Sequence, residues 1–120
     1  MARCVPPAPI KMKIGSLITV TVDRPLGSHH PKYPDMIYPV NYGYVKGVMA
    51  ADGEEQDAYV IGVEEHVKEF TGILIAVIHR KDDVEDKWVV APQGMTISKE
   101  EIAQKVAFQE RYFQIEICMK

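Results

Sequence analysis

The sequence predicts a mainly β protein, a small five-stranded antiparallel barrel with one covering helix near its C-terminal end. Short apolar segments rich in β-branched residues alternate with turn-forming residues, which is typical of strands, and the period becomes helical after Ser98. With 120 residues and 47% hydrophobic content, the chain suits one domain with one core. We expect residues 14–120 to form that domain and residues 1–13 to be a mobile N-terminal tail.

The segments expected to be strands are spaced as in a small closed or half-closed antiparallel barrel. They are residues 17–22, 41–50, 57–63, 70–79 and 87–92. The proline-rich segment 27–39 can hold little regular structure beyond a turn or a short edge.

The helix is predicted by a start signal and by the spacing of apolar residues. Ser98 and Glu101 match a capping box, and four small or branched apolar residues between 102 and 107 then fall on one helical face. We expect a helix over 99–111 that covers the barrel, followed by a weakly alternating segment, 112–118, as a last short strand.

Charge and cysteine content exclude several classes of protein. The formal net charge of −3 argues against a nucleic-acid-binding domain. No apolar run is long enough to cross a bilayer, and the first residues lack the apolar core of a signal peptide. Only Cys4 and Cys118 are present, without a CxxC motif, which favours a reduced setting. We expect a cytoplasmic protein that binds neither nucleic acid nor membrane.

The acidic stretch Asp52-Gly-Glu-Glu-Gln-Asp57 leads directly into an apolar segment. Two carboxylates held about 4 Å apart repel by roughly 4 kcal/mol at an effective dielectric near 20, so a fold that converges them needs a divalent cation. Oxygen ligands of this kind favour Mg²⁺. A solvated acidic turn is the alternative, and the spacing alone does not decide between them. A second acidic run, 82–86, lies between two expected strands.

Two central blocks carry a resemblance to a known family. The segment "YPVNYGYV" (38–45), followed after a short spacer by "DGEEQDAYV" (52–60), resembles the signature of the soluble family I inorganic pyrophosphatases. Looser similarity extends over "VDRPLGSHHPKY" (22–33), "DKWVVAP" (86–92) and "SKEEIAQKVAFQERYF" (98–113), so that it covers roughly residues 14–113. The resemblance implies an OB-like barrel, hydrolysis of pyrophosphate with Mg²⁺ or Mn²⁺, and a homo-oligomer such as a hexamer.

The resemblance also implies roles for individual residues. The residues that match metal ligands are Asp52, Asp57, Asp82 (or Asp83) and Asp86, and Asp23 matches an acid near an outer metal. Glu54 matches the group that takes a proton from the attacking water. The residues that match phosphate-binding groups are Lys32, Tyr42, Lys87 and Tyr112.

The chain also departs from the family pattern. Only five residues separate Lys32 from Tyr38, where the family has a hairpin with a phosphate-binding arginine, and Phe113 stands where the family has a lysine. Arg24, Arg80 and Lys81 are candidates to replace the lost cations. These departures support an alternative function, a catalytically weak or inactive module that binds a phosphate ligand or a protein partner.

Overall fold

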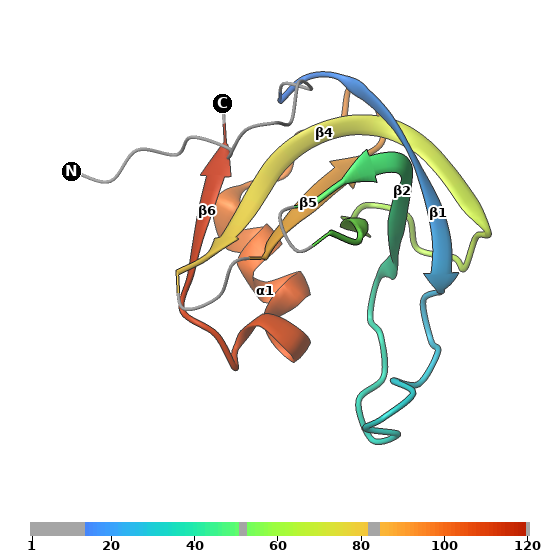
Figure 1. Ribbon diagram of the computed structural model, residues 1–120. Coiled ribbons are helices and arrows are strands. Elements are labelled where there is room, and N and C mark those ends of the chain that lie inside the picture. Colours follow the sequence, from blue (N-terminus) through green and yellow to red (C-terminus); the bar gives the residue numbers. More distant parts are fainter. Residues whose placement is uncertain (1–13, 51–52, 82–84, 120) are drawn as a thin grey trace.

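The computed structural model describes residues 14–50, 53–81 and 85–119, so the expected N-terminal tail lies outside the description. Its elements run along the chain in the order shown in Figure 1. They are β1 (Leu17–Arg24), β2 (Asn41–Met49), β3 (Glu55–Val60), β4 (Glu69–Arg80), β5 (Asp86–Ala91), α1 (Lys99–Glu110) and β6 (Ile115–Met119). Every expected strand and the expected helix are confirmed, with small shifts at their ends.

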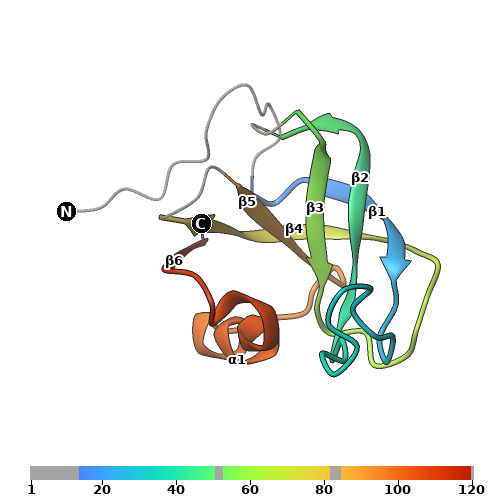
Figure 2. The same ribbon diagram turned by 60° about the horizontal axis from the view of Figure 1, so that its bottom comes forward.

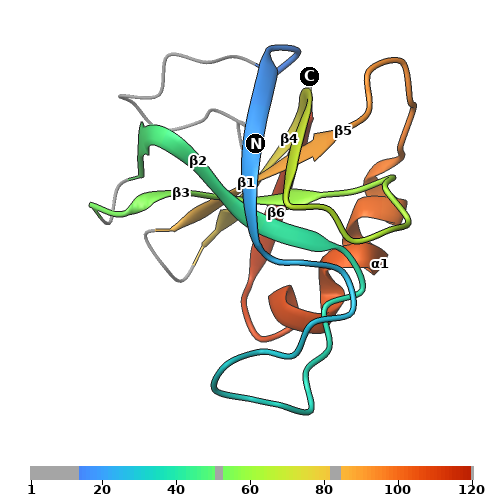
Figure 3. The ribbon, with the colours of Figure 1, turned by 90° about the vertical axis from the view of Figure 1, so that its right-hand side faces the viewer.

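The strands form one sheet in the order β1-β2-β3-β5-β4-β6, and the additional pairing of β1 with β4 closes the first five into a barrel. Strand β6 extends the sheet from the outer side of β4. One pairing departs from the all-antiparallel expectation, because β3 and β5 run parallel, with Ala58 opposite Trp88. The long crossing from β3 through β4 brings β5 back beside β3, so the barrel is mixed (Figure 3).

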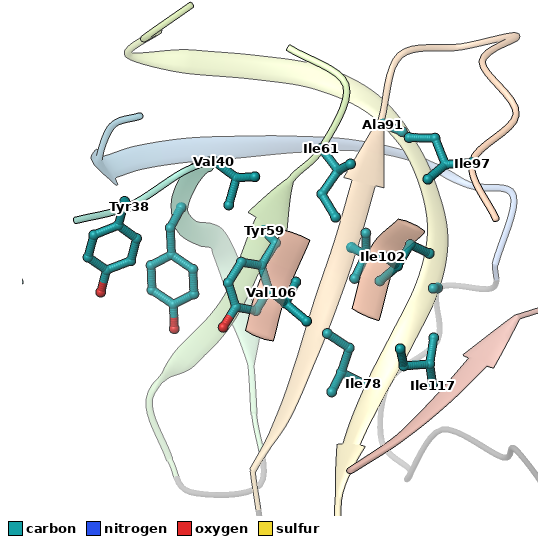
Figure 4. Packing of buried hydrophobic residues seen from close by; sticks show 13 residues of the cluster. Tyr38, Val40, Tyr59, Ile61, Ile78, Ala91, Ile97, Ile102, Val106 and Ile117 are labelled. Atoms are coloured by element: carbon teal, nitrogen blue, oxygen red, sulfur yellow. The ribbon is translucent and has the colours of Figure 1, made fainter. Parts of the chain in front are cut away.

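Two apolar clusters occupy the two faces of this sheet. The cluster inside the barrel includes Val20, Leu74 and Trp88. The second cluster lies on the outer face of the sheet, where α1 packs as a cover (Figure 2). Figure 4 shows this second cluster, with Ile102 and Val106 of the helix beside residues of the strands. Alternate residues of each strand therefore serve two separate cores.

Helix α1 begins at the predicted cap, since the Ser98 hydroxyl accepts a hydrogen bond from the Glu101 backbone N–H at 3.1 Å. Its buried residues are Ile102, Val106 and Glu110, which recur every four residues and form one stripe. The last of these is a carboxylate, so the stripe carries a charge into the interface with the barrel. No helix in the described part of the chain is both long and apolar enough to cross a membrane.

A β-bulge in β1 determines which side chain faces the outer core. Val22 pairs with Gly43 and Arg24 pairs with Tyr42, so Asp23 is the extra residue. The bulge therefore places Arg24, and not Asp23, on the same face as Tyr42. Gly43 is required here, because a Cβ at this position would lie 1.9 Å from the Thr21 carbonyl oxygen.

The segment between β1 and β2 forms a short irregular hairpin. The backbone N–H of Gly27 donates to the Tyr38 carbonyl, and that of Tyr38 donates to the Ser28 carbonyl. Residues 27–38, named here the entry hairpin, project from the barrel at the end where α1 turns into β6 (Figure 1).

Candidate functional site

A cleft of about 970 Å³ opens between the entry hairpin and the end of helix α1. Its floor is the outer face of β2, β3 and β5, and its walls are the hairpin on one side and residues 108–113 on the other. The lining combines four cationic side chains, Arg24, Arg80, Lys87 and Arg111, with the carboxylates of Asp23, Asp35 and Asp57. A concave site of this size, in which polar groups converge beside aromatic side chains, is the pattern expected of a binding pocket.

Lys87 lies at the centre of the cleft floor. Its Nζ is 2.5 Å from Asp57 Oδ2, 3.0 Å from the Tyr42 hydroxyl and 3.2 Å from Glu85 Oε1. The parallel pairing of β3 with β5 explains this meeting, because it brings the strand ends that carry Asp57 and Lys87 side by side. Lys87 is almost fully buried, whereas the Asp57 side chain keeps 36% of its surface exposed toward the cleft.

The protonation states on the floor follow from burial and charge. Burial alone lowers the pKa of Lys87, but the adjacent Tyr42 oxygen and Asp57 carboxylate raise that pKa by more, so the amine is cationic at neutral pH. Burial raises the pKa of the Tyr42 phenol, and Lys87 only partly opposes this shift. The floor therefore presents an ammonium group and a neutral hydroxyl, both suited to phosphate oxygens.

A chain of hydrogen bonds joins the bulge in β1 to helix α1. Arg24 Nη1 donates to the Tyr38 hydroxyl at 2.7 Å, and that hydroxyl donates to Gln109 Oε1 at 3.2 Å. Gln109 Nε2 in turn donates to the Tyr59 hydroxyl at 2.7 Å. The phenol oxygens of Tyr38 and Tyr59 point toward the same side in Figure 4. Since Arg24 also lies over the Tyr42 ring, 5.7 Å from its centroid, the chain fixes a second cation beside the floor.

Arg80 forms a separate and more enclosed group with Glu110. The guanidinium donates through Nε to Glu110 Oε1 at 2.9 Å and through Nη2 to Oε2 at 2.7 Å, a bidentate pair. The same Oε2 accepts from the Tyr59 hydroxyl at 2.7 Å, and Arg80 Nη1 donates to Glu85 Oε1 at 3.0 Å. The Phe113 ring packs against the guanidinium, with the ring centroid 3.7 Å from Arg80 Cζ. Phe113, at the position where the sequence resemblance expects a lysine, thus packs on a cation and does not supply one.

The predicted metal ligands are only partly brought together. Asp57 faces the cleft, but Asp86 faces the barrel interior, where its Oδ1 lies 2.8 Å from His79 Nδ1. The register gives the reason, because Asp86 and Lys87 are neighbours on one strand and neighbouring side chains point to opposite faces. Asp52, Asp82 and Asp83 lie outside the described residues.

The other predicted site residues divide in the same way. Tyr42 and Lys87 form the floor, and Asp23 and Tyr112 also line the cleft. Glu54 and Lys32 are exposed, and neither is among the described residues that line the cleft. Of the candidate replacement cations, Arg24 and Arg80 line the cleft, although the Arg80 side chain is only 6% exposed. Lys81 is exposed and is not part of the described lining.

Sequence reasoning did not identify Glu85, Gln109 and Glu110. For Glu85 a signal existed, because it directly precedes β5 and lies two positions before Lys87, a spacing that in extended backbone gives the same face. For Glu110, the spacing of four and eight residues from Val106 and Ile102 marks it as part of the buried stripe. The partner that makes this burial possible, Arg80, is 30 residues away in the sequence.

The residues on the cleft floor can be tested against the donor set that Mg²⁺ requires. Mg²⁺ is commonly held by one or two carboxylates together with substrate phosphates and water. Asp57 supplies one such carboxylate, half open to the cleft, and Lys87 occupies one of its oxygens. Within the described residues no three acidic, histidine or cysteine side chains cluster as a metal site. Asp57 is thus the carboxylate of the described floor that could contribute to a Mg²⁺ site, and Asp52, Asp82 and Asp83 lie outside the described residues.

Comparison with solved structures supports the fold. The chain is similar to an inorganic pyrophosphatase from Ehrlichia chaffeensis, with a TM-score of 0.66, 15% identity and coverage of 92% of each chain. It is also similar to one from Coxiella burnetii, with a TM-score of 0.61, 16% identity and coverage of 90% of this chain and 89% of that one. For one from Neisseria gonorrhoeae the TM-score is 0.59, the identity is 22%, and the coverage is 82% of this chain and 74% of that one.

At these identities the similarity establishes the pyrophosphatase fold over most of the chain. No family model matches the sequence, and no curated protein matches it. The fold implied by the central sequence blocks is therefore confirmed.

Proposed function

We propose that the protein hydrolyses inorganic pyrophosphate, or a closely related phosphoanhydride, in this cleft with the help of Mg²⁺. The observation that carries the proposal is the meeting of Lys87, Tyr42 and Asp57 on the cleft floor, within hydrogen-bonding distance of Lys87 Nζ. These three are residues that the pyrophosphatase resemblance assigns to phosphate and metal, and they lie on a barrel of the pyrophosphatase fold.

The side chains on the floor have distinct roles in binding. Lys87 already has three acceptors, so a phosphate oxygen must replace Asp57 or Glu85 as one of its partners. Asp57 is the better candidate to release Lys87, because its carboxylate borders the cleft and can instead bind a metal cation. Tyr42, whose phenol stays neutral, donates a hydrogen bond to the same phosphate, and Arg24 balances further negative charge.

Hydrolysis consumes one water. The water oxygen attacks one phosphorus atom, the bond from that phosphorus to the bridging oxygen breaks, and the second phosphate leaves with the bridging oxygen. Mg²⁺, when bound, neutralises phosphate charge and lowers the pKa of the attacking water. Asp57 is the described residue that would hold it, and Asp52 and Asp82 (or Asp83) are the proposed ligands outside the described residues. Mn²⁺ can take the place of Mg²⁺ on the same oxygen ligands.

The direct test is phosphate release from pyrophosphate with Mg²⁺ or Mn²⁺, compared with a chelated sample. We expect metal-dependent release from the parent protein and loss of most of it in Asp57→Asn, since the amide keeps the shape but loses the charge. Asp35→Asn is a matched control, because Asp35 also lines the cleft but lies on the entry hairpin. Absence of release from pyrophosphate and from other phosphoanhydrides contradicts the hydrolase proposal.

Glu54 is the proposed proton acceptor for the attacking water, a role that rests on its place in the sequence signature. General-base catalysis is typically worth about 100- to 10,000-fold in rate. We expect Glu54→Gln to lower kcat about 100-fold, near the lower end, because metal activation already favours loss of the proton. Glu64→Gln, in an exposed loop, is the control. Equal rates for Glu54→Gln and the parent under saturating Mg²⁺ disprove this role.

A second candidate function is a non-catalytic module that binds a phosphate ligand or a protein partner. The specific observation in its favour is that Asp57 and Asp86 point to opposite faces of the sheet, so the two cannot ligate the same ion. This candidate predicts that methylenediphosphonate, a hydrolysis-resistant analogue, binds in the presence of chelator, while pyrophosphate stays intact under all metal conditions.

We also propose that the protein is cytoplasmic and forms a homo-oligomer, with a hexamer as the form that the pyrophosphatase resemblance suggests. Light scattering on the purified chain gives its mass in solution. A monomeric mass at micromolar concentration contradicts the oligomer.

A further inference from the structure

The mouth of the cleft differs in chemistry from its floor. Three large apolar side chains line the mouth and are exposed, namely Tyr33 at 62%, Tyr112 at 63% and Ile37 at 52%. Tyr33 and Ile37 belong to the entry hairpin, and Tyr112 belongs to the opposite wall after α1. Single exposed apolar residues need no explanation, but a group of them around one opening is the pattern that marks binding sites. A small inorganic anion on the floor leaves this apolar mouth uncovered.

A series of ring contacts connects the floor to the mouth. The Tyr42 ring, whose hydroxyl touches Lys87, lies 5.6 Å from the Tyr38 ring. The Tyr38 ring lies 6.2 Å from that of His30, nearly parallel to it, and the His30 ring lies 5.1 Å from that of Tyr33. Tyr42, His30 and Tyr33 line the cleft, and the fully buried Tyr38 ring behind the lining connects Tyr42 to His30.

His30 is held in place at the mouth by its own backbone. Its Nδ1 accepts hydrogen bonds from the backbone N–H groups of Lys32 at 3.0 Å and of Tyr33 at 3.3 Å, which fixes the plane of the ring. Partial burial and the charges of Arg24 and Lys32 lower the pKa of His30, so the imidazole is neutral at pH 7. A neutral, oriented ring beside Tyr33 forms a preorganised stacking surface, and Arg111 on the opposite wall adds a cation next to Tyr112.

The size of the cleft agrees with a ligand larger than pyrophosphate. Its volume of about 970 Å³ lies at the upper end of the range for pockets that enclose drug-sized organic molecules. A ligand that uses both ends of the cleft must carry a phosphoanhydride at one end and a flat aromatic group at the other. Nucleoside di- and triphosphates have this construction, and base stacking on aromatic side chains tolerates every base.

We propose that the cleft binds a nucleoside di- or triphosphate, with its phosphates on the Lys87–Tyr42 floor and its base against Tyr33 and Tyr112 at the mouth. The proposal rests on the proposed function, because it uses the same floor for the phosphates. It goes beyond that function by assigning the base-binding surface to the entry hairpin and the turn after α1.

Calorimetric titration with two matched analogues tests the proposal. Methylenediphosphonate and α,β-methylene-ADP share a two-phosphorus unit that resists hydrolysis, and only the second carries a base. With Mg²⁺ present, we expect α,β-methylene-ADP to bind about 5- to 150-fold more tightly, which is the gain that one stacked base typically provides. Tyr33→Ala should remove most of this gain and leave methylenediphosphonate binding unchanged, whereas Tyr33→Phe should keep the gain. Leu17→Ala is the control, with a side chain 63% exposed on β1 and outside the described cleft lining.

The outcomes separate this proposal from the proposed function. Equal affinity for the two analogues, or tighter binding of methylenediphosphonate, overturns the nucleotide proposal and leaves the pyrophosphate site intact. Absence of binding by either analogue overturns both proposals. If Tyr33→Ala changes the mass of the protein in solution and leaves the ratio of the two affinities unaltered, the mouth is a contact between copies of the chain, and the nucleotide proposal is wrong.

Discussion

Two ion pairs on the outer face of the barrel differ in how far each is closed off from solvent. Arg80 and Glu110 have side chains only 6% and 1% exposed, and both oxygens of Glu110 accept hydrogen bonds from the arginine. Lys87 is equally buried, but its partner Asp57 opens to the cleft. The two cations lie on the adjacent strands β4 and β5, and both contact the same Glu85 oxygen.

The difference separates a structural pair from one that can exchange partners. The Arg80–Glu110 pair, named here the closed pair, joins the last turn of α1 to β4. The Tyr59 hydroxyl and the Phe113 ring complete its surroundings. Glu110 is buried and is not among the described residues that line the cleft, so a ligand there does not reach it. The Lys87–Asp57 pair, named here the open pair, has a carboxylate that is exposed to solvent. A ligand that brings charges of both signs can therefore insert between Asp57 and Lys87. Similar chemistry on one face thus stabilises the fold at one position and, in the proposed function, binds a ligand at the other.

Removing the carboxylate of the closed pair should give the largest effect. In Glu110→Ala, Arg80 keeps its charge in a buried position and loses both bidentate hydrogen bonds. Breaking a buried pair from one side typically costs about 3–5 kcal/mol. We expect a loss of this size in the free energy of unfolding, measured by urea denaturation. Gln104→Ala, on the exposed side of the same helix, should change it by no more than about 0.5 kcal/mol. A loss below about 1 kcal/mol for Glu110→Ala means that the pair does not hold the helix to the barrel.

Removing the cation of the open pair should affect binding more than folding. A hydrogen bond to a charged group is typically worth about 1.5–3 kcal/mol, so Lys87→Met should weaken methylenediphosphonate binding about 10- to 150-fold. Its unfolding free energy should fall by less than that of Glu110→Ala, because Asp57 is left in contact with solvent and can be hydrated. Lys46→Met, an exposed lysine of β2, is the control. The reverse pattern, a large loss of stability with unchanged binding, removes the distinction between the two pairs.

The elements of the fold could be predicted because their signals are local. The β-branched runs gave all of the barrel strands, and Ser98 with Glu101 gave the start of α1. The parallel pairing of β3 with β5 could not be predicted in this way, because it depends on which strands meet after the long crossing through β4. Strand existence is a property of short segments, whereas strand order is a property of the whole chain.

The residues of the cleft floor could be predicted because their signals are also local, whereas the face on which Asp86 lies could not. Tyr42, Asp57 and Lys87 belong to motifs with fixed positions, and the structure brings them together. Asp86 lies in an acidic run in which a shift of one residue reverses the face, and it points into the barrel while Glu85 contacts Lys87 on the outer face. The closed pair was missed because Arg80 and Glu110 come from β4 and α1, with no local pattern that connects them.

The smallest expected effect is a difference in how the contribution of each pair to the unfolding free energy depends on pH. Lys87 has a folded-state pKa raised above its ordinary value, mainly by Tyr42 and Asp57 acting against burial. A raised pKa means that the pair's contribution to stability is fully present below the pKa of the unfolded lysine, near 10.5, and is lost as pH rises through the folded-state value. Arg80 stays protonated throughout this range, so the closed pair has no such dependence.

We therefore expect the difference in unfolding free energy between the parent and Lys87→Met to stay constant from neutral pH to about pH 10, and to decrease above it. The raised pKa of the Tyr42 phenol acts in both proteins and largely cancels in the difference. The corresponding difference between the parent and Glu110→Ala should remain flat over the same range, which makes it the internal control. Urea denaturation at intervals between pH 8 and 11 measures both. A flat difference for Lys87→Met shows that Lys87 gains nothing from Asp57 and Tyr42, and the open pair is then not an ion pair that contributes to folding.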